Sequence, residues 1–240
     1  MLRANQGFPV TIVCCVLASM LCARAATAAT IFVDDFGDRD AQDGSPVTWA
    51  ASLGTWDASS GDYVATGSLP RVSLVPAHVL GNTSARAQVR VTGTINAGIA
   101  LRRQSPLVGY AGEIQANGTL AIARKDGPDA PVTLGSLIVP FNPVSQDVLL
   151  QFDAIGNTLS LWAWRLGEPM PTQPQVVAFD NTYAQGQVGL VSAAVSAAAS
   201  DATTFRFVQV ADAHLPEPSA FMLVSLAGCG LLYGRRRKRC

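Results

Sequence analysis

Polar and apolar residues alternate along short runs that recur within residues 30–213, which is the pattern of strands with one buried face. The runs cover residues 87–95, 97–101, 109–116, 119–125, 148–154, 158–166 and 203–210. Asn117-Gly118 and Gly156-Asn157 each separate two runs, and pairs of this kind favour tight hairpins. The one helix-friendly stretch, residues 193–199, is too short to be stable alone. The pattern therefore predicts an all-β fold of antiparallel strands, a sandwich or a barrel.

The N-terminal segment differs from this pattern and has the three parts of a secretory signal. Arg3 supplies a positive charge, Phe8–Leu21 is an apolar run of 14 residues, and Ala26-Thr27-Ala28 is a small-x-small cleavage motif. We expect residues 1–29 to be a signal peptide, cleaved near Ala28 or Ala29. The alternative is an uncleaved anchor helix, but a spanning helix needs roughly 20 residues.

The C-terminal segment also combines an apolar run with a positive cluster. Ala220–Leu232 is a mainly apolar run of 13 residues, about 20 Å of helix at 1.5 Å per residue, which can span a bilayer that thins locally. The run is followed by five consecutive positive charges, which the positive-inside rule would keep in the cytoplasm: Arg235, Arg236, Arg237, Lys238 and Arg239. We expect a C-terminal hydrophobic helix that contacts the membrane.

Pro216-Glu217-Pro218, the apolar run and the basic tail together resemble the PEP-CTERM sorting signal of Gram-negative bacteria, over residues 214–240. The resemblance implies recognition by an exosortase, a membrane-embedded processing enzyme. It also implies cleavage near Pro216-Glu217-Pro218 and delivery to the cell surface or extracellular matrix. The alternative is a plain C-terminal membrane anchor.

The composition of residues 30–215, between these two segments, argues against several classes of function. Hydrophobic residues make up 49% of the chain and charged residues 14%, which argues against disorder. Residues 30–215 hold ten basic and 16 acidic residues, a net charge of −6, and they contain no basic cluster larger than a pair such as Arg102–Arg103. We therefore expect no nucleic-acid partner. All five cysteines lie in the terminal segments and the chain has two histidines, so a zinc site is not expected.

Residues 31–212 are similar to the concanavalin A-like jelly roll in its laminin-G-like bacterial form, and we assign residues 30–213 to this domain. The similarity is carried by short motifs spread over the segment: Phe32-Val33-Asp34-Asp35-Phe36, Gly54-Thr55-Trp56, Gly61-Asp62-Tyr63, Gly98-Ile99-Ala100-Leu101-Arg102, Trp164-Arg165-Leu166-Gly167 and Thr204-Phe205-Arg206-Phe207. It implies two packed antiparallel sheets, a jelly-roll sandwich, with the first and last strands adjacent.

Catalytic patterns are missing from this segment. Glycan-hydrolysing jelly rolls carry alternating carboxylates on one strand, since the acid and its partner must sit roughly 5–10 Å apart. Glu113 and Glu168 are the only glutamates in the domain, and neither has an acidic residue two positions away. There is no Gly-x-Ser-x-Gly elbow and no cysteine nucleophile. We expect a noncatalytic protein, with a hydrolase whose site is unrecognised as the alternative.

Binding residues are easier to nominate. Trp162, Trp164 and Ser160 fall on one face of a predicted strand, where indoles could stack on sugar rings beside a hydroxyl. Tyr110 is a further aromatic candidate. The alternative is that both tryptophans cover a core.

Calcium is the candidate cofactor, because laminin-G-like domains often hold it and it prefers carboxylate oxygens. Asp34, Asp35 and Asp201 are the candidate ligands, since Asp201 would lie near the other two if the first and last strands pair. Further aspartates follow at Asp38, Asp40 and Asp43. The alternative is a set of solvated turn residues.

The sequence as a whole predicts an exported, noncatalytic bacterial surface or matrix protein that could bind polysaccharide through its jelly roll. A purely structural or adhesive matrix protein is the third alternative.

Overall fold

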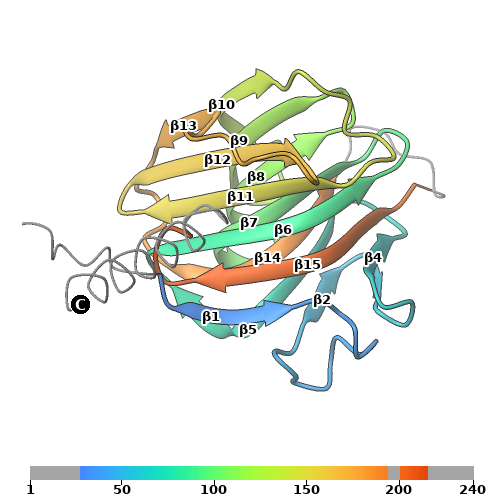
Figure 1. Ribbon diagram of the computed structural model, residues 1–240. Helices are drawn as coiled ribbons and strands as arrows, with labels where there is room; N and C mark the ends of the chain where they lie inside the picture. Colours follow the sequence, from blue (N-terminus) through green and yellow to red (C-terminus); the bar gives the residue numbers. More distant parts are fainter. Residues whose placement is uncertain (1–27, 194–200, 216–240) are drawn as a thin grey trace, which may run out of the picture.

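The computed structural model describes residues 28–193 and 201–215. Within these ranges every regular element is a strand, and two antiparallel sheets pack face to face (Figure 1). None of these residues belongs to a helix that is long and apolar enough to cross a membrane. Residues 1–27 of the predicted signal peptide, residues 194–199 of the helix-friendly stretch and the sorting motif from Pro216 onward lie outside the described residues. The predicted antiparallel jelly-roll sandwich is confirmed.

The first sheet has eight strands in the order β13-β12-β11-β6-β15-β4-β3, and β1 also pairs with β15. Its strands are β1 (Thr30–Asp34), β3 (Thr55–Asp57), β4 (Tyr63–Thr66), β6 (Thr83–Val91), β11 (Val148–Ile155), β12 (Thr158–Arg165), β13 (Val176–Phe179) and β15 (Thr203–Ala211). In Figure 1 this sheet forms the front layer.

The second sheet has seven strands in the order β10-β9-β8-β7-β14-β5-β2. Its strands are β2 (Ala50–Leu53), β5 (Arg71–Leu80), β7 (Asn96–Ser105), β8 (Val108–Gln115), β9 (Thr119–Asp126), β10 (Val132–Ile138) and β14 (Gly186–Ala193). It forms the layer behind the first sheet in Figure 1.

Both predicted hairpins are present. Asn117-Gly118 connects β8 to β9, and Gly156-Asn157 connects β11 to β12. Gly118 and Gly156 have φ values of 86° and 58°, a region that glycine enters without strain. These turns fix the registers, so that Ile114 lies opposite Leu120 and Ala154 opposite Leu159.

The core lies between the sheets and follows the two-residue period of the strands. Leu159, Leu161 and Ala163 of β12 belong to it, as the alternation predicts. From the opposite sheet, Gly112 of β8 lies so close to Phe152 that a Cβ atom there would come within 2.8 Å of the ring. The sheets therefore make close contact at Gly112.

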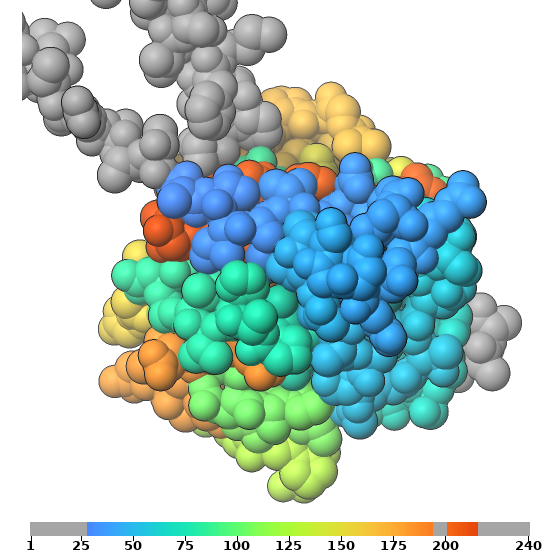
Figure 2. Space-filling model, turned by 90° about the horizontal axis from the view of Figure 1, so that it is seen from below, coloured from blue at the N-terminus to red at the C-terminus, as the bar shows by residue number. Residues whose placement is uncertain are grey.

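The first and last strands are neighbours, as the resemblance implied. In β1 and β15, Phe32 pairs with Val210 and Asp34 with Val208. The pairing continues one residue beyond the strands, where Asp212 donates its backbone N–H to the Ala29 carbonyl at 3.2 Å. Figure 2 shows the segments of the first strands, in blue and cyan, forming much of the surface on that side of the molecule.

Candidate functional site

The predicted stacking platform of Trp162 and Trp164 is not exposed. Both indoles do lie on the face of β12 opposite the core, but their exposed fractions are 5% and 3%. They form a small second cluster with Met170, the His214 ring lies 5.4 Å from that of Trp162, and the Arg86 guanidinium lies 5.7 Å from that of Trp164. Ser160 shares this face and is half-buried. The prediction of an indole platform is therefore wrong, because other side chains cover both rings.

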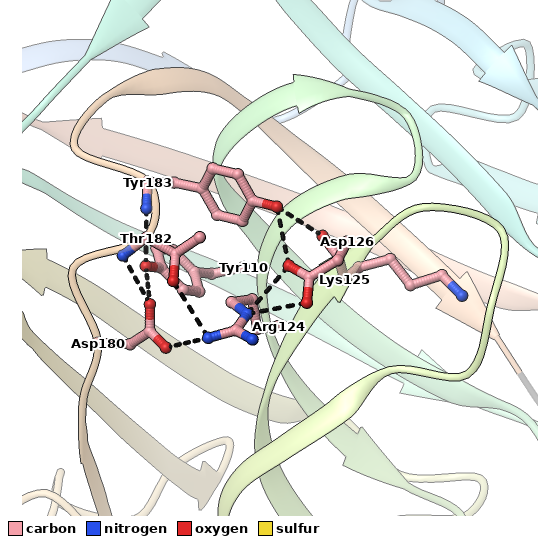
Figure 3. Close-up of polar contacts among 7 residues, drawn as sticks. All are labelled: Tyr110, Arg124, Lys125, Asp126, Asp180, Thr182 and Tyr183. Carbon is pink, nitrogen blue, oxygen red and sulfur yellow. Dashed lines mark hydrogen bonds and ion pairs between the residues drawn. The ribbon is translucent and has the colours of Figure 1, made fainter.

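Tyr110 is buried in the main core and is committed to a polar network at one end of the sandwich (Figure 3). Its hydroxyl donates to Asp180 Oδ1 at 2.5 Å and accepts the Tyr183 N–H at 3.0 Å. Arg124 Nη1 donates to the other oxygen of Asp180 at 2.6 Å. The Arg124 Nε binds Asp126, which also accepts the Tyr183 hydroxyl at 2.8 Å. The prediction of Tyr110 as a sugar-binding residue is wrong, since its hydroxyl has both partners inside the fold.

This network joins the two sheets, because Asp180 directly follows β13 of the first sheet while Tyr110 and Arg124 belong to β8 and β9 of the second. Burial by itself would raise the pKa of Asp180, but the hydrogen bonds from Tyr110, Thr182 and Arg124 outweigh burial and lower it to about 2. Burial also raises the pKa of Tyr110 to about 12. Both groups therefore hold one charge state across the neutral range, which suits a structural role.

The carboxylates proposed for calcium are not brought together. Asp34 accepts the Trp49 indole N–H at 2.7 Å and the Phe36 N–H at 2.8 Å, so both of its oxygens are occupied. Because Asp34 pairs with Val208, Asp201 lies seven residues farther along the β15 segment, about 20 Å away at 3.3 Å per residue. Asp201 instead accepts the Thr94 N–H at 3.3 Å.

The remaining aspartates of this region are turn residues. Asp35, Asp38, Asp40 and Asp43 each accept the N–H two positions ahead, which is the Asx-turn arrangement. Among the described residues, no group of three or more His, Cys, Asp or Glu side chains could hold a metal ion. The turn alternative accounts for these four side chains.

A hollow of about 370 Å³ lies on the outer face of the seven-stranded sheet, and we call it the sheet hollow. Its floor consists of small side chains from three strands of this sheet: Ala111 of β8, Ala121 and Ala123 of β9, and Val191 of β14. The walls include Pro70 before β5 and the β7–β8 turn. The hollow exists because outward positions on neighbouring strands carry small residues while the inward positions carry Ile99, Ile114 and Ile122.

Arg103 enters the sheet hollow because β7 is irregular near its end. The register of β7 against β8 shifts between Leu101 and Ser105, and Arg102 has a φ of 52°. This places Arg102 among the carbonyls of Gly81, Ala154 and Tyr183 and turns Arg103 to the outer face. Arg103 lies against Gly109, where a Cβ atom would come within 2.9 Å of its Cδ.

Glu113 is the single carboxylate that lines the sheet hollow. Its side chain lies across Gly98, where a Cβ atom would approach its Cγ to 2.7 Å, and it accepts the Asn96 amide at 3.4 Å. Burial raises the pKa of Glu113, while the nearby charge of Arg103 and the Asn96 hydrogen bond partly offset this. Lys125 of β9 stands at the same hollow and donates to the Pro128 carbonyl at 3.3 Å.

The sheet hollow can bind a polar ligand, but it lacks the second carboxylate that glycoside hydrolysis needs. Glu168, the other glutamate of the domain, lines a shallower surface site with Asp147. There Glu168 pairs with Arg165, and Asp147 pairs with Arg90 and Arg206. These two acids are engaged by cations and do not form a free acid–base pair.

Sequence reasoning missed Arg103, Asn96 and Lys125 as site residues and considered Glu113 only as a catalytic acid. Two signals pointed to them: Arg102–Arg103 and Arg124–Lys125 are basic pairs of the domain, and small residues recur at alternate positions of β8 and β9. Neither signal reveals a β-bulge, so the direction of the Arg103 side chain could not be read from the chain.

No protein-family model matches the chain, and no curated protein matches it. Several solved structures do match the chain. The carbohydrate-binding module CBM66 from Bacillus subtilis is similar with a TM-score of 0.54 at 14% identity, over 67% of this chain and 92% of that one. The exoplasmic/lumenal domain of VIP36, bound to Ca²⁺ and Man3GlcNAc, gives a TM-score of 0.53 at 12% identity, over 77% and 92%.

The xylan β-1,4-xylosidase from Bacillus halodurans C-125 is similar with a TM-score of 0.54 at 14% identity. The match covers 75% of this chain but 38% of the xylosidase, so this chain corresponds to a minor part of that enzyme. At these identities the likeness shows a shared fold: the chain is an antiparallel jelly-roll sandwich of the kind found in these three proteins.

Proposed function

We propose that the protein is an exported, noncatalytic bacterial surface or matrix protein that binds polysaccharide through the sheet hollow. The observation that carries this proposal is a hollow of about 370 Å³ lined by two arginines, a glutamate, a lysine and amide side chains over an alanine floor. Its volume lies at the small end of the range for ligand sites, about 300–1,000 Å³. Charged and amide groups of this kind can bond the hydroxyls of a sugar.

The structural neighbours support the same class of ligand. One is described as a carbohydrate-binding module, and another was determined with Man3GlcNAc bound. A single carboxylate in the sheet hollow supports binding over hydrolysis.

Export and sorting form the second half of the proposal, and they rest on the two terminal segments. Removing residues 1–29 and the residues from Pro216 onward would take away none of the described strands, since β1 begins at Thr30 and β15 ends at Ala211. The jelly roll could thus be the portion delivered after a signal peptidase and an exosortase have acted.

Affinity electrophoresis of the full-length chain, kept in a mild detergent because of its apolar ends, tests the binding function. We expect gels containing a bound polysaccharide to retard the protein, and Ala123→Trp to abolish the retardation by filling the sheet hollow. The matched control is Val177→Trp on β13, at a position that is 44% exposed on the other sheet. If no neutral or acidic polysaccharide retards the wild-type protein, the binding function is wrong; if Ala123→Trp binds normally, the site is elsewhere.

A further inference from the structure

The charges around the sheet hollow are opposite in sign to those of the domain. Arg71, Arg103 and Lys125 line it against Glu113 alone, a net charge of +2, whereas residues 30–215 carry −6. Arg71 is held by the carbonyls of Ala65 and Gly67. Lys125 donates to the carbonyls of Pro128 and Asp129, which leaves one N–H of its ammonium group for a ligand. Arg103 is therefore the main cation that a ligand would meet, and Lys125 can add one further hydrogen bond.

Arg103 has unused hydrogen-bonding capacity in this position. Its exposed fraction is 5%, its Nε–H is buried without a partner, and its Nη1 makes one long bond of 3.4 Å to the Pro106 carbonyl. It forms no ion pair within 4 Å with any described residue. Burying a cation without a partner costs desolvation free energy, and a bound anion that pairs with the cation offsets this cost.

Glu113 does not neutralise Arg103 by a direct contact. The two groups are close enough for each to shift the pKa of the other, but they share neither a hydrogen bond nor an ion pair. Burial lowers the pKa of Arg103 to about 10, so the guanidinium remains charged at neutral pH. A guanidinium fork with a free Nε–H matches the two oxygens of a carboxylate.

The lining also argues against a site built for neutral sugars by stacking. No aromatic side chain is among the residues that line the sheet hollow, whereas sugar rings commonly pack on indole or phenol rings. Recognition here must come from charge and hydrogen bonds over a flat alanine floor.

We propose that the sheet hollow binds an acidic saccharide, with the carboxylate of a uronic-acid unit on Arg103 and Lys125 and its hydroxyls on Glu113 and Asn96. This rests on the polysaccharide-binding function proposed above and specifies its substrate class. Glu113 then serves as an acceptor for sugar hydroxyls, and Arg103 distinguishes acidic from neutral chains.

The test compares gels containing polygalacturonate, its carboxyl-reduced form, or dextran sulfate, run with the full-length chain at about 0.15 M salt to screen surface charge. We expect strong retardation by polygalacturonate alone. Arg103→Met should weaken it about tenfold or more, since hydrogen bonds between charged groups are lost. Arg90→Met removes the same charge outside the hollow and should change the affinity less than twofold. Lys125→Met, at the rim, covers the case in which Arg103→Met does not fold.

The outcomes separate the two proposals. If the carboxyl-reduced polymer retards the protein as strongly as polygalacturonate, or if Arg103→Met and Lys125→Met both bind normally, acidic recognition is wrong although polysaccharide binding stands. Stronger retardation by dextran sulfate than by polygalacturonate also overturns the carboxylate assignment. No retardation by any polymer overturns the polysaccharide-binding function itself.

Discussion

At the scale of single residues, several side chains that look available for function are committed to holding the sandwich together. Asp180 is an example: it has four hydrogen-bond donors around one carboxylate, from Tyr110, Thr182 and Arg124. Its side chain is 9% exposed. A carboxylate in this state stabilises the fold and has no capacity left for a ligand.

The stability that Asp180 supplies should depend on pH. Its pKa is lowered from 3.8 to about 2, so its contribution is present above about pH 4 and is lost as the pH falls toward 2. A shift of this size corresponds to about 2 kcal/mol at neutral pH. We expect Asp180→Asn to lower the free energy of unfolding by about that amount at pH 7 and by much less near pH 2, measured by denaturant titration.

Asp40→Asn is the control for this measurement, because Asp40 is exposed and an asparagine can accept the same Gln42 N–H. Equal stability of Asp180→Asn and the wild-type protein at pH 7 would show that the charge of Asp180 contributes nothing to stability.

At the scale of elements, β12 has two packed faces. Leu159, Leu161 and Ala163 face the core, while Trp162 and Trp164 pack under Met170 and His214 on the other side. The tryptophans therefore belong to the stability of the eight-stranded sheet, and the opposite sheet carries the candidate ligand site.

Trp164→Ala should accordingly act on folding. Removing a buried tryptophan costs about 3 kcal/mol or more in protein cores, and we expect a loss near 3 kcal/mol in urea unfolding, with polysaccharide retardation unchanged. Val177→Ala on the neighbouring strand should change stability by less than about 1 kcal/mol. A Trp164→Ala variant that keeps its stability but no longer binds polysaccharide would contradict the sheet hollow as the site and would support a ligand site on β12.

The elements were predictable where local chemistry decides them. Asn117-Gly118 and Gly156-Asn157 set two hairpins, and alternation gave the inward residues of β12. Strands β5, β10 and β13 were not expected, since apolar residues stand next to each other in their sequences. The sheet hollow could not be predicted, because it depends on four strands meeting side by side and on a bulge that turns Arg103 outward. Pairing of the first and last strands was expected. The register of that pairing was not expected, and it places Asp201 far from Asp34.

At the scale of the whole molecule, the described strands lie between the two segments that we propose are removed. The folded unit needs β15, which pairs with β6, β4 and β1. Processing must therefore leave Thr203–Ala211 intact, and a cut near Pro216-Glu217-Pro218 does so.

Intact-mass spectrometry of the protein recovered from its host's medium or cell surface checks the sorting proposal. We expect a chain that begins near Ala29 and ends near Pro218, and an Arg235–Arg239 deletion that abolishes processing at the C-terminal end. A recovered chain that still carries Ala220–Leu232 would favour the plain membrane anchor.

The hydrogen bond between Asp212 and Ala29 has a practical consequence for protein engineering. The chain enters and leaves the jelly roll at neighbouring positions. The domain can therefore be inserted into a surface loop of a carrier protein without spreading the ends of that loop. Joining the two ends by a short turn would likewise allow new termini to be opened at the hairpin of Gly156-Asn157, far along the chain from the natural ones. Because β1 and β15 are neighbours, the domain can be transferred between proteins as a unit.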